Sequence, residues 1–543
     1  MREWWRDAVI YQIYPRSFQD STGNGTGDLK GITRRLDHVA SLGVDAIWLS
    51  PFFTSPDRDM GYDVSDYCDV SPLYGDLADF DALVARAHAL GLKVIIDQVL
   101  SHTSDQHPWF SQSRTDTSND KANWYVWADP LPDGSPPNNW LSIFGGSAWQ
   151  FDPRRRQYYL HNFLTEQPDL NFHEPQVVEA LLGVMRFWLD RGVDGFRLDT
   201  VNFYVHDAEL RSNPALSPDP FPHNPYEAQD QIYSKTRPEN REVLRRMRAL
   251  TDQYDARMMV GEVGDSLHSI EIMADYTSGG DKLHMAYSFE FLGPDHSAAH
   301  FRSRITDFQT KAPDGWPCWS FSNHDVDRHV SRWTPPDGNT DAVAMQSIAM
   351  LAHFPGTLGI YQGEELGQTQ TDILFEELQD TANIAFWPDY KGRDGCRTPM
   401  TWEAAAPNAG FSSATPWLPV KPPQAARAVD VQEARNTSVL HHYRAVLAHR
   451  KKTPALTRGT TAFLDLPEPV LGITRSLPDD QVTGLFNLSD KTQHLTFHGQ
   501  ASQTGEAQAK VDGSSITLPP HGFLTLAHAA DITVAPATQP APA

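Results

Sequence analysis

Residues 195–200 read Gly195-Phe196-Arg197-Leu198-Asp199-Thr200, a short apolar run that contains an arginine and ends in a carboxylate. Such a run is typical of a buried strand, and polar residues gather where the strands of a parallel sheet end. Arg197 and Asp199 are two positions apart, so their side chains are expected to project from one face. The guanidinium would then keep Asp199 ionised. The segment predicts a buried strand with a charged site at its carboxyl end.

Runs of the same kind recur along the chain and alternate with stretches at helical spacing. They are Ala8–Tyr14, Ala46–Ser50, Val94–Val99, Met258–Val263, Met285–Phe291, Cys318–Ser322 and Leu358–Gln362. Alternating strands and helices predict βα units around a parallel sheet. Together with residues 195–200, about eight strands predict an α/β protein built as a closed (β/α)8 TIM barrel.

The alternation breaks between residues 103 and 172, where Trp, Asn, Pro and Gly are frequent, and again after residue 455, where short alternating runs begin. A structureless loop as long as the first segment is rare, so a small subdomain is expected there. We predict a barrel from residues 1–102 and 173–455, an inserted subdomain at 103–172, an antiparallel C-terminal β-sandwich at 456–530 and a disordered tail at 531–543.

The composition limits the partners. The chain has 543 residues, with 45 Lys and Arg against 69 Asp and Glu, a formal net charge of −24. Phosphates would be repelled, so neither nucleic acid nor a membrane is expected as a partner, whereas a neutral small molecule fits. Cys68, Cys318 and Cys396 lack the spacing of a disulfide framework or a zinc site. Without a signal-peptide pattern or a long apolar run, a cytoplasmic protein is expected.

Polar residues also end three more of the predicted strands. These ends read Asp97-Gln98-Val99-Leu100-Ser101-His102, Gly261-Glu262-Val263 and Ser322-Asn323-His324-Asp325. The carboxyl ends of barrel strands meet at one face, which would bring Asp199, Glu262 and Asp325 together. Glu262 follows an apolar run, where a carboxyl group tends toward a raised pKa and can donate a proton. The pattern predicts a site with a carboxylate base and a carboxylic acid.

Plainer explanations exist for each residue. A carboxylate at a strand end often caps a helix or pairs with a basic side chain. Independent caps would not place the carboxylates at these strand ends with His102 and His324 beside them. A metal centre is a further alternative, but the spacing typical of zinc ligands is missing from the sequence.

These segments resemble the conserved regions of glycoside hydrolase family 13, the α-amylase family. The resemblance begins at Tyr11–Phe18 and extends to the C-terminal β-domain. Within the family, Gln167–Phe172 and Gly392–Met400 are most similar to bacterial α-glucosidases and oligo-1,6-glucosidases. The resemblance implies a glycosidase that needs no cofactor for catalysis.

Matched position by position, the resemblance implies the roles of the site residues. Asp199 would be the nucleophile, Glu262 the general acid/base and Asp325 the carboxylate that binds ring hydroxyls. An Asp59–Arg393 pair would close the non-reducing end, so that glucose is removed one unit at a time. The implied substrate-binding residues are Asp59, Tyr62, His102, Phe144, Phe163, Arg197, Thr200, His324 and Arg393. For Phe144 and Phe163, the alternative to lining the sugar pocket is ordinary packing in the core.

The function implied is a retaining, exo-acting α-glucosidase that cleaves short α-1,4-linked glucosides such as maltose by double displacement, with transfer to acceptor alcohols or sugars. Thr200 favours α-1,4 linkages by resemblance, because relatives that prefer α-1,6 linkages tend to have Val there. Alternatives are an oligo-1,6-glucosidase, a sucrose-active α-glucosyltransferase, a dedicated transglucosylase, and an inactive homologue that serves as a binding subunit. The oligomeric state stays open.

A glycine-rich segment, residues 20–28, follows the first predicted strand. It resembles the divalent-cation loop of these enzymes and offers oxygen ligands at alternate positions, namely Asp20, Thr22, Asn24, Thr26 and Asp28. Related proteins tend to have Asn and Asp where this chain has Thr22 and Asn24, which removes one charge. A structural Ca²⁺ or Mg²⁺ is expected, with a metal-free glycine-rich turn as the alternative.

Overall fold

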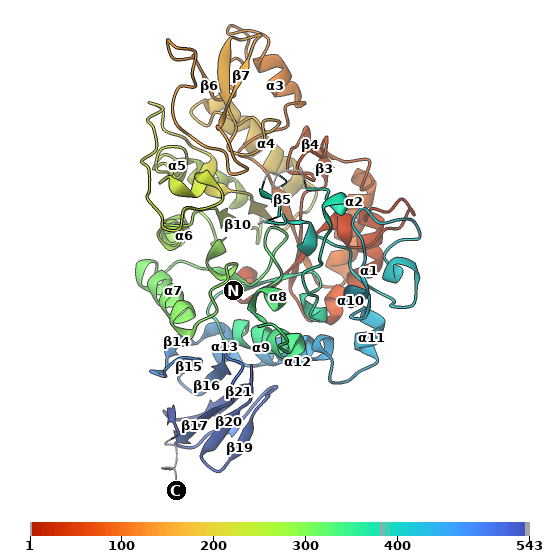
Figure 1. Ribbon diagram of the computed structural model, residues 1–543, viewed down its shortest axis with the longest axis vertical. Coiled ribbons are helices and arrows are strands. Elements are labelled where there is room, and N and C mark those ends of the chain that lie inside the picture. Colours follow the sequence, from red (N-terminus) through yellow and green to blue (C-terminus); the bar gives the residue numbers. More distant parts are fainter. Residues whose placement is uncertain (1–2, 381–383, 385, 389, 538–543) are drawn as a thin grey trace.

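The computed structural model describes residues 3–380, 384, 386–388 and 390–537. In this part of the chain, eight parallel strands form one sheet in the order β11-β10-β9-β5-β2-β1-β13-β12. Their bounds are β1 Val9–Ile13, β2 Ala46–Leu49, β5 Lys93–Gln98, β9 Gly195–Leu198, β10 Met258–Val263, β11 Met285–Ser288, β12 Cys318–Ser320 and β13 Thr357–Tyr361. A parallel bridge between Ala286 and Pro317 joins the first strand of this order to the last. The predicted TIM barrel is therefore confirmed (Figure 1).

Several predicted strands are longer than the observed ones, and the difference is largest at β11. β11 ends at Ser288, and the 3-10 turn η6, Phe289–Phe291, follows where the strand was expected to continue. Phe291 turns outward and packs against Phe301 and Trp319, with ring centroids 5.1 and 4.7 Å away. β12 ends at Ser320 rather than Ser322. The apolar residues after these strands therefore serve the packing of the surrounding helices and not the barrel sheet.

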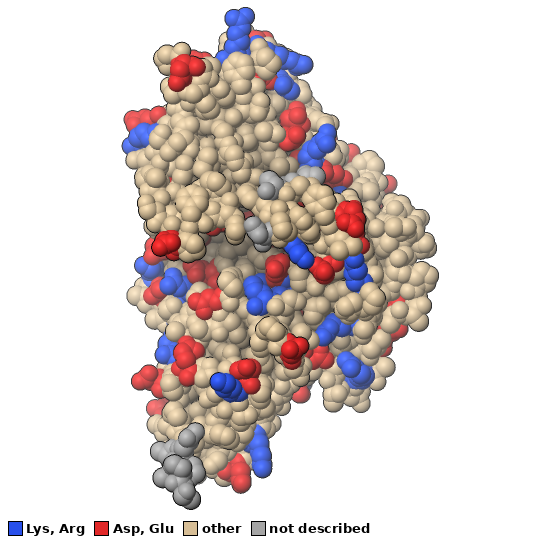
Figure 2. All heavy atoms as spheres, in the orientation of Figure 1, with Lys and Arg blue, Asp and Glu red and all other residues tan. Residues whose placement is uncertain are grey.

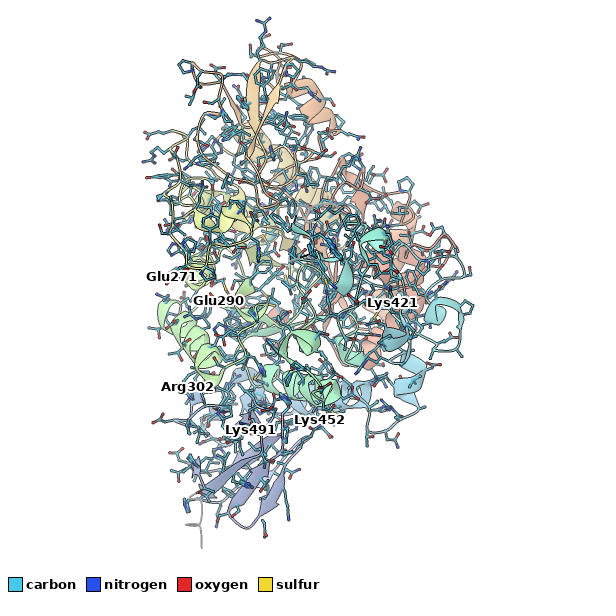
Figure 3. All side chains as sticks on the ribbon, in the orientation of Figure 1. Glu271, Glu290, Arg302, Lys421, Lys452 and Lys491 are labelled. Atoms are coloured by element: carbon cyan, nitrogen blue, oxygen red, sulfur yellow. The ribbon has the colours of Figure 1, made fainter. Side chains whose placement is uncertain are left out.

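Helices surround the barrel (Figure 1), and several of the longer ones bury one apolar stripe. In α4, Leu181, Met185 and Trp188 are buried at helical spacing. Charged residues such as Glu271 and Lys452 project from the outer side (Figure 3). The helices are α1 Leu29–Ser41, α2 Leu77–Ala89, α4 Pro175–Asp190, α5 Asn240–Thr251, α6 Ser269–Thr277, α7 Ala298–Lys311, α8 His329–Trp333, α9 Thr340–Leu351, α10 Pro422–Ala425, α11 Val429–Glu433, α12 Val439–Lys452 and α13 Pro454–Arg458. Among the described residues, none of them has the length and apolar character needed to cross a membrane.

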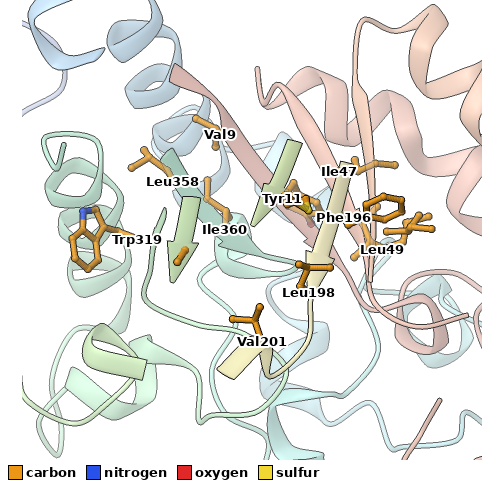
Figure 4. Close-up of a cluster of buried hydrophobic side chains, with 14 of the residues drawn as sticks. Val9, Tyr11, Ile47, Leu49, Phe196, Leu198, Val201, Trp319, Leu358 and Ile360 are labelled. Atoms are coloured by element: carbon orange, nitrogen blue, oxygen red, sulfur yellow. The ribbon is translucent and has the colours of Figure 1, made fainter. Parts of the chain in front are cut away.

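Strand side chains that point away from the barrel axis form the main core with the helices. Tyr11, Ile47, Phe196, Leu198 and Leu358 belong to this core and lie close together in Figure 4. All five are fully buried. Burying an aliphatic or aromatic side chain of this size contributes about 1.5–3 kcal/mol. The packing therefore fixes the strand ends from which the site residues project.

Residues 103–172 contain a small antiparallel sheet in the order β6-β8-β7, with β6 Trp127–Ala128, β8 Gln157–Leu160 and β7 Trp149–Asp152. The helix α3, Pro108–Ser113, belongs to the same segment, which lies at one end of the molecule (Figure 1). Trp140 and Trp149 stack in its own apolar cluster, with ring centroids 5.7 Å apart. A bridge from His102 to Asp169 brings the ends of the segment back to the barrel. A separate hairpin joins β3 Phe53–Thr54 to β4 Asp66–Val70.

The C-terminal region holds two antiparallel sheets that face each other across a shared apolar cluster. Their strand orders are β14-β15-β16-β21-β18 and β19-β20-β17-β22. The bounds are β14 Thr460–Phe463, β15 Val470–Leu477, β16 Asp480–Asn487, β17 Gln493–His498, β18 Ser502–Gln503, β19 Lys510–Asp512, β20 Ser515–Leu518, β21 Phe523–His528 and β22 Thr533–Pro536. Leu485 and Leu524 from the first sheet meet Leu495 and Leu518 from the second. The arrangement is the antiparallel C-terminal domain expected from the sequence.

One part of the predicted disordered tail is ordered. Residues 533–536 form β22 and pair with β17 in antiparallel register. Ile532 is buried and Val534 packs against the same apolar cluster, so this alternation provides a reason for the strand to dock. The prediction of disorder is wrong for these residues, and residues 538–543 lie outside the described part of the chain.

Candidate active site

A cavity of about 780 Å³ lies at the carboxyl ends of the barrel strands. Figure 2 shows a hollow near the centre of one face, with acidic and basic side chains beside it. The predicted site residues that line the cavity are Asp59, Tyr62, His102, Phe144, Phe163, Asp199, Thr200, Glu262, Asp325 and Arg393. Arg197 and His324, which were expected to contact the sugar directly, are buried beneath the cavity wall. The cavity volume is in the range of pockets that enclose small molecules.

The register of the strands brings the charged residues together. In the parallel pair β5 and β9, Asp97 lies opposite Arg197. In the pair β10 and β9, Gly261 lies opposite Leu198, so Glu262 and Asp199 are each the next residue along. Glu262 in turn lies opposite Tyr287 of β11. Neighbouring barrel strands therefore place these side chains at the same level.

The guanidinium of Arg197 joins the two predicted reacting carboxylates. Its Nη1 lies 2.5 Å from Asp199 Oδ1 and 2.8 Å from Asp97 Oδ1, and its Nη2 lies 2.5 Å from Glu262 Oε1. The Tyr287 hydroxyl donates to Glu262 Oε1 at 2.8 Å and accepts from Arg197 Nη2 at 2.9 Å. Asp199 and Glu262 therefore share one cavity and one cation.

Thr200 forms a second connection between the same two carboxylates. Its backbone N–H donates to Glu262 Oε2, and its hydroxyl donates to Asp199 Oδ2, both at 3.2 Å. Thr200 has φ of 39°, in the left-handed region, which β-branched residues rarely adopt. This conformation costs about 1–3 kcal/mol, and such strain is common where a site imposes the geometry. The turn after the strand directs the N–H of Thr200 at Glu262.

Burial dominates the titration of the pair. It raises the pKa of Glu262 to about 7 against the opposing charge of Arg197. It also raises the pKa of Asp199 to about 7, although Arg197 acts in the opposite direction. The expectation that Arg197 keeps Asp199 ionised therefore needs correction, because the guanidinium is shared with Asp97 and Glu262. The pair loses its two protons in steps that belong to both groups.

These pKa values predict a bell-shaped dependence of kcat/KM on pH with its maximum near pH 7. At lower pH both carboxyls carry a proton and the site has no nucleophile, whereas at higher pH the pair has lost the proton that the leaving group needs. The profile of kcat/KM against pH, measured over the range in which the protein stays folded, checks this. A rate that keeps rising far above neutral pH would contradict the shared-proton pair.

Asp325 has a different environment. Its Oδ1 lies 3.0 Å from Arg397 Nη2 and 3.4 Å from Arg393 Nη1, and its Oδ2 lies 3.3 Å from His324 Nε2. Burial opposes ionisation, but His324, Arg397 and Arg393 together lower the pKa of Asp325 to about 2. Burial also lowers the pKa of His324 well below its usual value, so the two guanidiniums supply the charge at neutral pH. Asp325 is therefore a permanent anion.

Tyr62, His102 and His324 form a connected group beside Asp325. The rings of Tyr62 and His324 stack with centroids 5.3 Å apart, and their Oη and Nε2 atoms are 2.6 Å apart. His102 Nε2 lies 2.9 Å from the Tyr62 carbonyl oxygen. Burial lowers the pKa of His102 to about 4, so this ring is neutral at pH 7. The predicted sugar-binding roles of these residues stay predictions.

The Asp59–Arg393 pair forms one side of the cavity. Arg393 Nη2 donates to Asp59 Oδ1 at 2.8 Å and to Asp380 Oδ1 at 3.0 Å. The Arg393 guanidinium also lies 5.1 Å from the ring centroid of Phe144. The Phe144 and Phe163 rings are 5.8 Å apart, and both line the cavity. The predicted pair and the predicted aromatic residues therefore meet on one wall.

Several residues of this network had no role predicted from the sequence. Asp97 stood in a quoted strand end, but its contact with Arg197 depends on the register of β5 against β9. Tyr287 stood in a predicted strand, but its contact with Glu262 depends on the register of β10 against β11. Asp380 lies in an irregular segment 13 residues before Arg393. The partners in these contacts are not separated by any regular spacing in the sequence, so the contacts could not be predicted from it.

The predicted cation loop is closed by its own hydrogen bonds. Asp20 accepts hydrogen bonds from the backbone of Thr22, Gly23 and Gly25. Asp28 accepts from the backbone of Ser21 and from Gly31, where it caps α1. Asn24 accepts from the N–H of Thr26. Both carboxylates therefore face N–H donors, an arrangement that matches the metal-free glycine-rich turn, and the cation stays a prediction.

Paired carboxylates at the strand ends of a (β/α)8 barrel, beside a pocket of this size, are an arrangement that glycoside hydrolases use. The family description "Alpha amylase, catalytic domain" matches residues 12–459, and the chain belongs to the α-amylase family, glycoside hydrolase family 13. Within that family it is similar to α-glucosidases and oligo-1,6-glucosidases.

Three similar proteins illustrate the relationship. A probable α-glucosidase of Rhizobium meliloti (strain 1021) is 61% identical, over 94% of this chain and 96% of the relative. An oligo-1,6-glucosidase of Parageobacillus thermoglucosidasius is 37% identical, over 90% of this chain and 91% of the relative. The crystal structure of an α-glucosyl transfer enzyme, XgtA, superimposes with a TM-score of 0.94 at 52% identity, covering 97% of this chain and 100% of XgtA.

Proposed function

We propose that the protein is a retaining, exo-acting α-glucosidase that cleaves short α-1,4-linked glucosides such as maltose and transfers glucose to hydroxyl acceptors. The observation that carries this proposal is the shared contact of Asp199 and Glu262 with Arg197 at the cavity wall. Retaining glycosidases place two carboxyl groups about 5–5.5 Å apart, close enough for direct attack on the sugar. Two carboxylates on one guanidinium fit this requirement.

The reaction proceeds in two displacements. Asp199 attacks the anomeric carbon from the β face while Glu262 protonates the departing glycosidic oxygen, which forms a β-glucosyl ester and releases the aglycone. Glu262, now ionised, then takes a proton from water or another hydroxyl, which attacks the ester carbon and restores the α configuration. Asp325, the permanent anion, binds ring hydroxyls and favours the distorted sugar ring.

The exo-action follows from the Asp59–Arg393 pair. The pair lies beside Phe144 on the cavity wall, and we expect it to leave a bound sugar no room to extend past that wall. A substrate therefore enters with its non-reducing end first, and one glucose is released in each cycle. Hydrolysis of longer chains from the interior is not expected.

Transfer is part of the proposal because one close structural relative is described as an α-glucosyl transfer enzyme. The lining of the cavity includes Phe144, Phe163, Phe203 and Phe289, which offer apolar surface to an acceptor. Initial rates with maltose, isomaltose, sucrose and trehalose, followed by chromatography of products with and without an added alcohol, test the function. Activity on isomaltose alone would favour the oligo-1,6-glucosidase alternative. Activity on sucrose alone would favour the sucrose-active transferase.

Thr200 is the proposed determinant of linkage. Its hydroxyl contacts Asp199 at 3.2 Å and the residue lines the cavity, so its side chain lies beside the reacting bond. Thr200→Val removes this hydrogen bond without a large change in volume. We expect the ratio of kcat/KM for isomaltose to that for maltose to rise about tenfold, the effect of about 1.4 kcal/mol. An unchanged ratio would contradict the assignment of linkage preference to this residue.

A further inference from the structure

Lys235 is a buried lysine on the cavity wall that the proposed mechanism does not use. Only 2% of its surface is exposed. Its Nζ donates to the Gly264 carbonyl oxygen at 2.6 Å and lies 3.3 Å from Asp265 Oδ2. Gly264 and Asp265 follow β10, two and three residues after Glu262. A buried ammonium is costly without partners, so these contacts hold the strand end in place.

Asn202 holds the same glycine from the other side. Asn202 Oδ1 accepts the Gly264 N–H at 3.0 Å, and its Nδ2 donates to the Gly264 carbonyl oxygen at 3.2 Å. Asn202 Nδ2 also donates to the Thr236 hydroxyl at 3.0 Å, and the Thr236 N–H donates to the Asn202 carbonyl oxygen at 2.6 Å. Thr236 is the neighbour of Lys235, and Asn202 comes three residues after Asp199. We call Asn202, Lys235, Thr236 and Gly264 the strand-end clamp.

The residues of the clamp are closely packed against Phe203. A side chain at Gly264 would approach the Phe203 ring to 3.1 Å, and the Lys235 Nζ lies 4.8 Å from the centroid of that ring. The clamp therefore ties the segment that follows Asp199 to the segment that follows Glu262. Its hydrogen bonds act on the backbone, independently of the contacts that Arg197 makes with the two carboxyl groups.

We propose that Lys235 is a positioning residue that sets Glu262 against the leaving oxygen by holding the backbone at Gly264. This inference rests on the proposed function, in which Glu262 is the general acid. Removal of the ammonium takes away the shorter of the two hydrogen bonds to the Gly264 carbonyl oxygen, leaves the one from Asn202 at 3.2 Å, and loosens the strand end that carries Glu262. A misplacement of about 1 Å can lower a rate by about 10²-fold.

The test is how the rate of Lys235→Met depends on the leaving group. This substitution keeps an unbranched side chain as long as the lysine stem and removes the ammonium. The parameter is kcat/KM, which reports the first displacement. For maltose, whose leaving oxygen needs the proton, we expect a fall of about 10²-fold. For α-glucosyl fluoride, whose fluoride departs with little help from an acid, we expect a fall of less than about threefold. Equal falls for the two substrates, or no fall for maltose, would overturn the proposal.

The controls separate positioning from folding and from the proposed function. Lys282 is a buried lysine with matching partners, the Ser278 carbonyl oxygen at 2.8 Å and Asp281 Oδ1 at 3.1 Å, but it is outside the cavity lining. Lys282→Met should leave both kcat/KM values unchanged. Glu262→Gln should show the same dependence on the leaving group as Lys235→Met, a large fall for maltose and a small one for α-glucosyl fluoride. If Glu262→Gln lacks this dependence, the proposed function is wrong. If Glu262→Gln shows it and Lys235→Met does not, only the proposed role of Lys235 is wrong. Should Lys235→Met not fold, Asn202→Ala tests the clamp with the same readout.

Discussion

Replacing Asp199 by alanine is expected to lower kcat for maltose by about 10⁴-fold or more, because the variant cannot form the glucosyl ester. The fold should survive, since Arg197 keeps its contacts with Asp97 and Glu262 and the substitution removes a carboxylate whose ionisation burial opposes. Steady-state rates and the thermal midpoint of unfolding, measured together, check both halves of this expectation.

A matched control is Asp152→Ala. Asp152 is a buried aspartate that pairs with Arg114 at 2.7 Å in the β6-β8-β7 region, and it is not among the residues that line the cavity. This variant should lose stability but keep the turnover number of the folded enzyme. Near-normal turnover in Asp199→Ala, or an equal loss in Asp152→Ala, would show that Asp199 is not the nucleophile.

Arg197→Met is the second substitution with a large expected effect, on stability as well as on rate. Its removal leaves Asp97, Asp199 and Glu262 buried without their shared cation. Breaking a buried ion pair by removing one partner costs about 3–5 kcal/mol. Because the guanidinium lowers the pKa of all three carboxyls, their pKa values should rise, and the residual activity should reach its maximum at a higher pH than in the wild type. Urea unfolding and the pH profile measure the two effects.

Arg475→Met supplies the comparison. Arg475 is a buried arginine of β15 that donates to the carbonyl oxygens of His353 and Gly459. Its replacement should lower stability while leaving the pH optimum in place. A pH optimum that moves equally in both variants, or that stays in place in Arg197→Met, would contradict the assignment of the pair's pKa values to Arg197.

Much of the barrel could be predicted because each strand is a short apolar run and each run ends in turn or polar residues. The ends were less predictable. Phe291 is as apolar as a strand residue, and only its packing against Phe301 shows that the chain has left the sheet. In the same way Ile532 and Val534 look like part of a low-complexity tail until the β17 edge is present to pair with them. Both the end of β11 and the formation of β22 depend on tertiary contacts, which cannot be read from the local sequence.

The candidate site shows a similar division. Asp199, Glu262 and Asp325 were visible because strand-end carboxylates are unusual in an apolar context. The sharing of Arg197 depends on strand register, which sets Asp97 beside Arg197 and Tyr287 beside Glu262. Because of that register, Asp199 and Glu262 titrate together near pH 7, whereas the sequence predicted only an Asp199 that Arg197 keeps ionised and a Glu262 with a raised pKa. Lys235 was invisible for another reason, since it lies in an irregular segment whose path the sequence does not fix.

A nucleophilic Asp199 forms a covalent ester, which peptide mass spectrometry detects most directly after reaction with a fluorinated α-glucosyl donor that forms the ester faster than the ester is hydrolysed. One added glycosyl unit is expected on the peptide that contains Asp199, together with α-glucose as the first-formed product of maltose by proton NMR. Label on another carboxylate, or β-glucose as the first product, would contradict it.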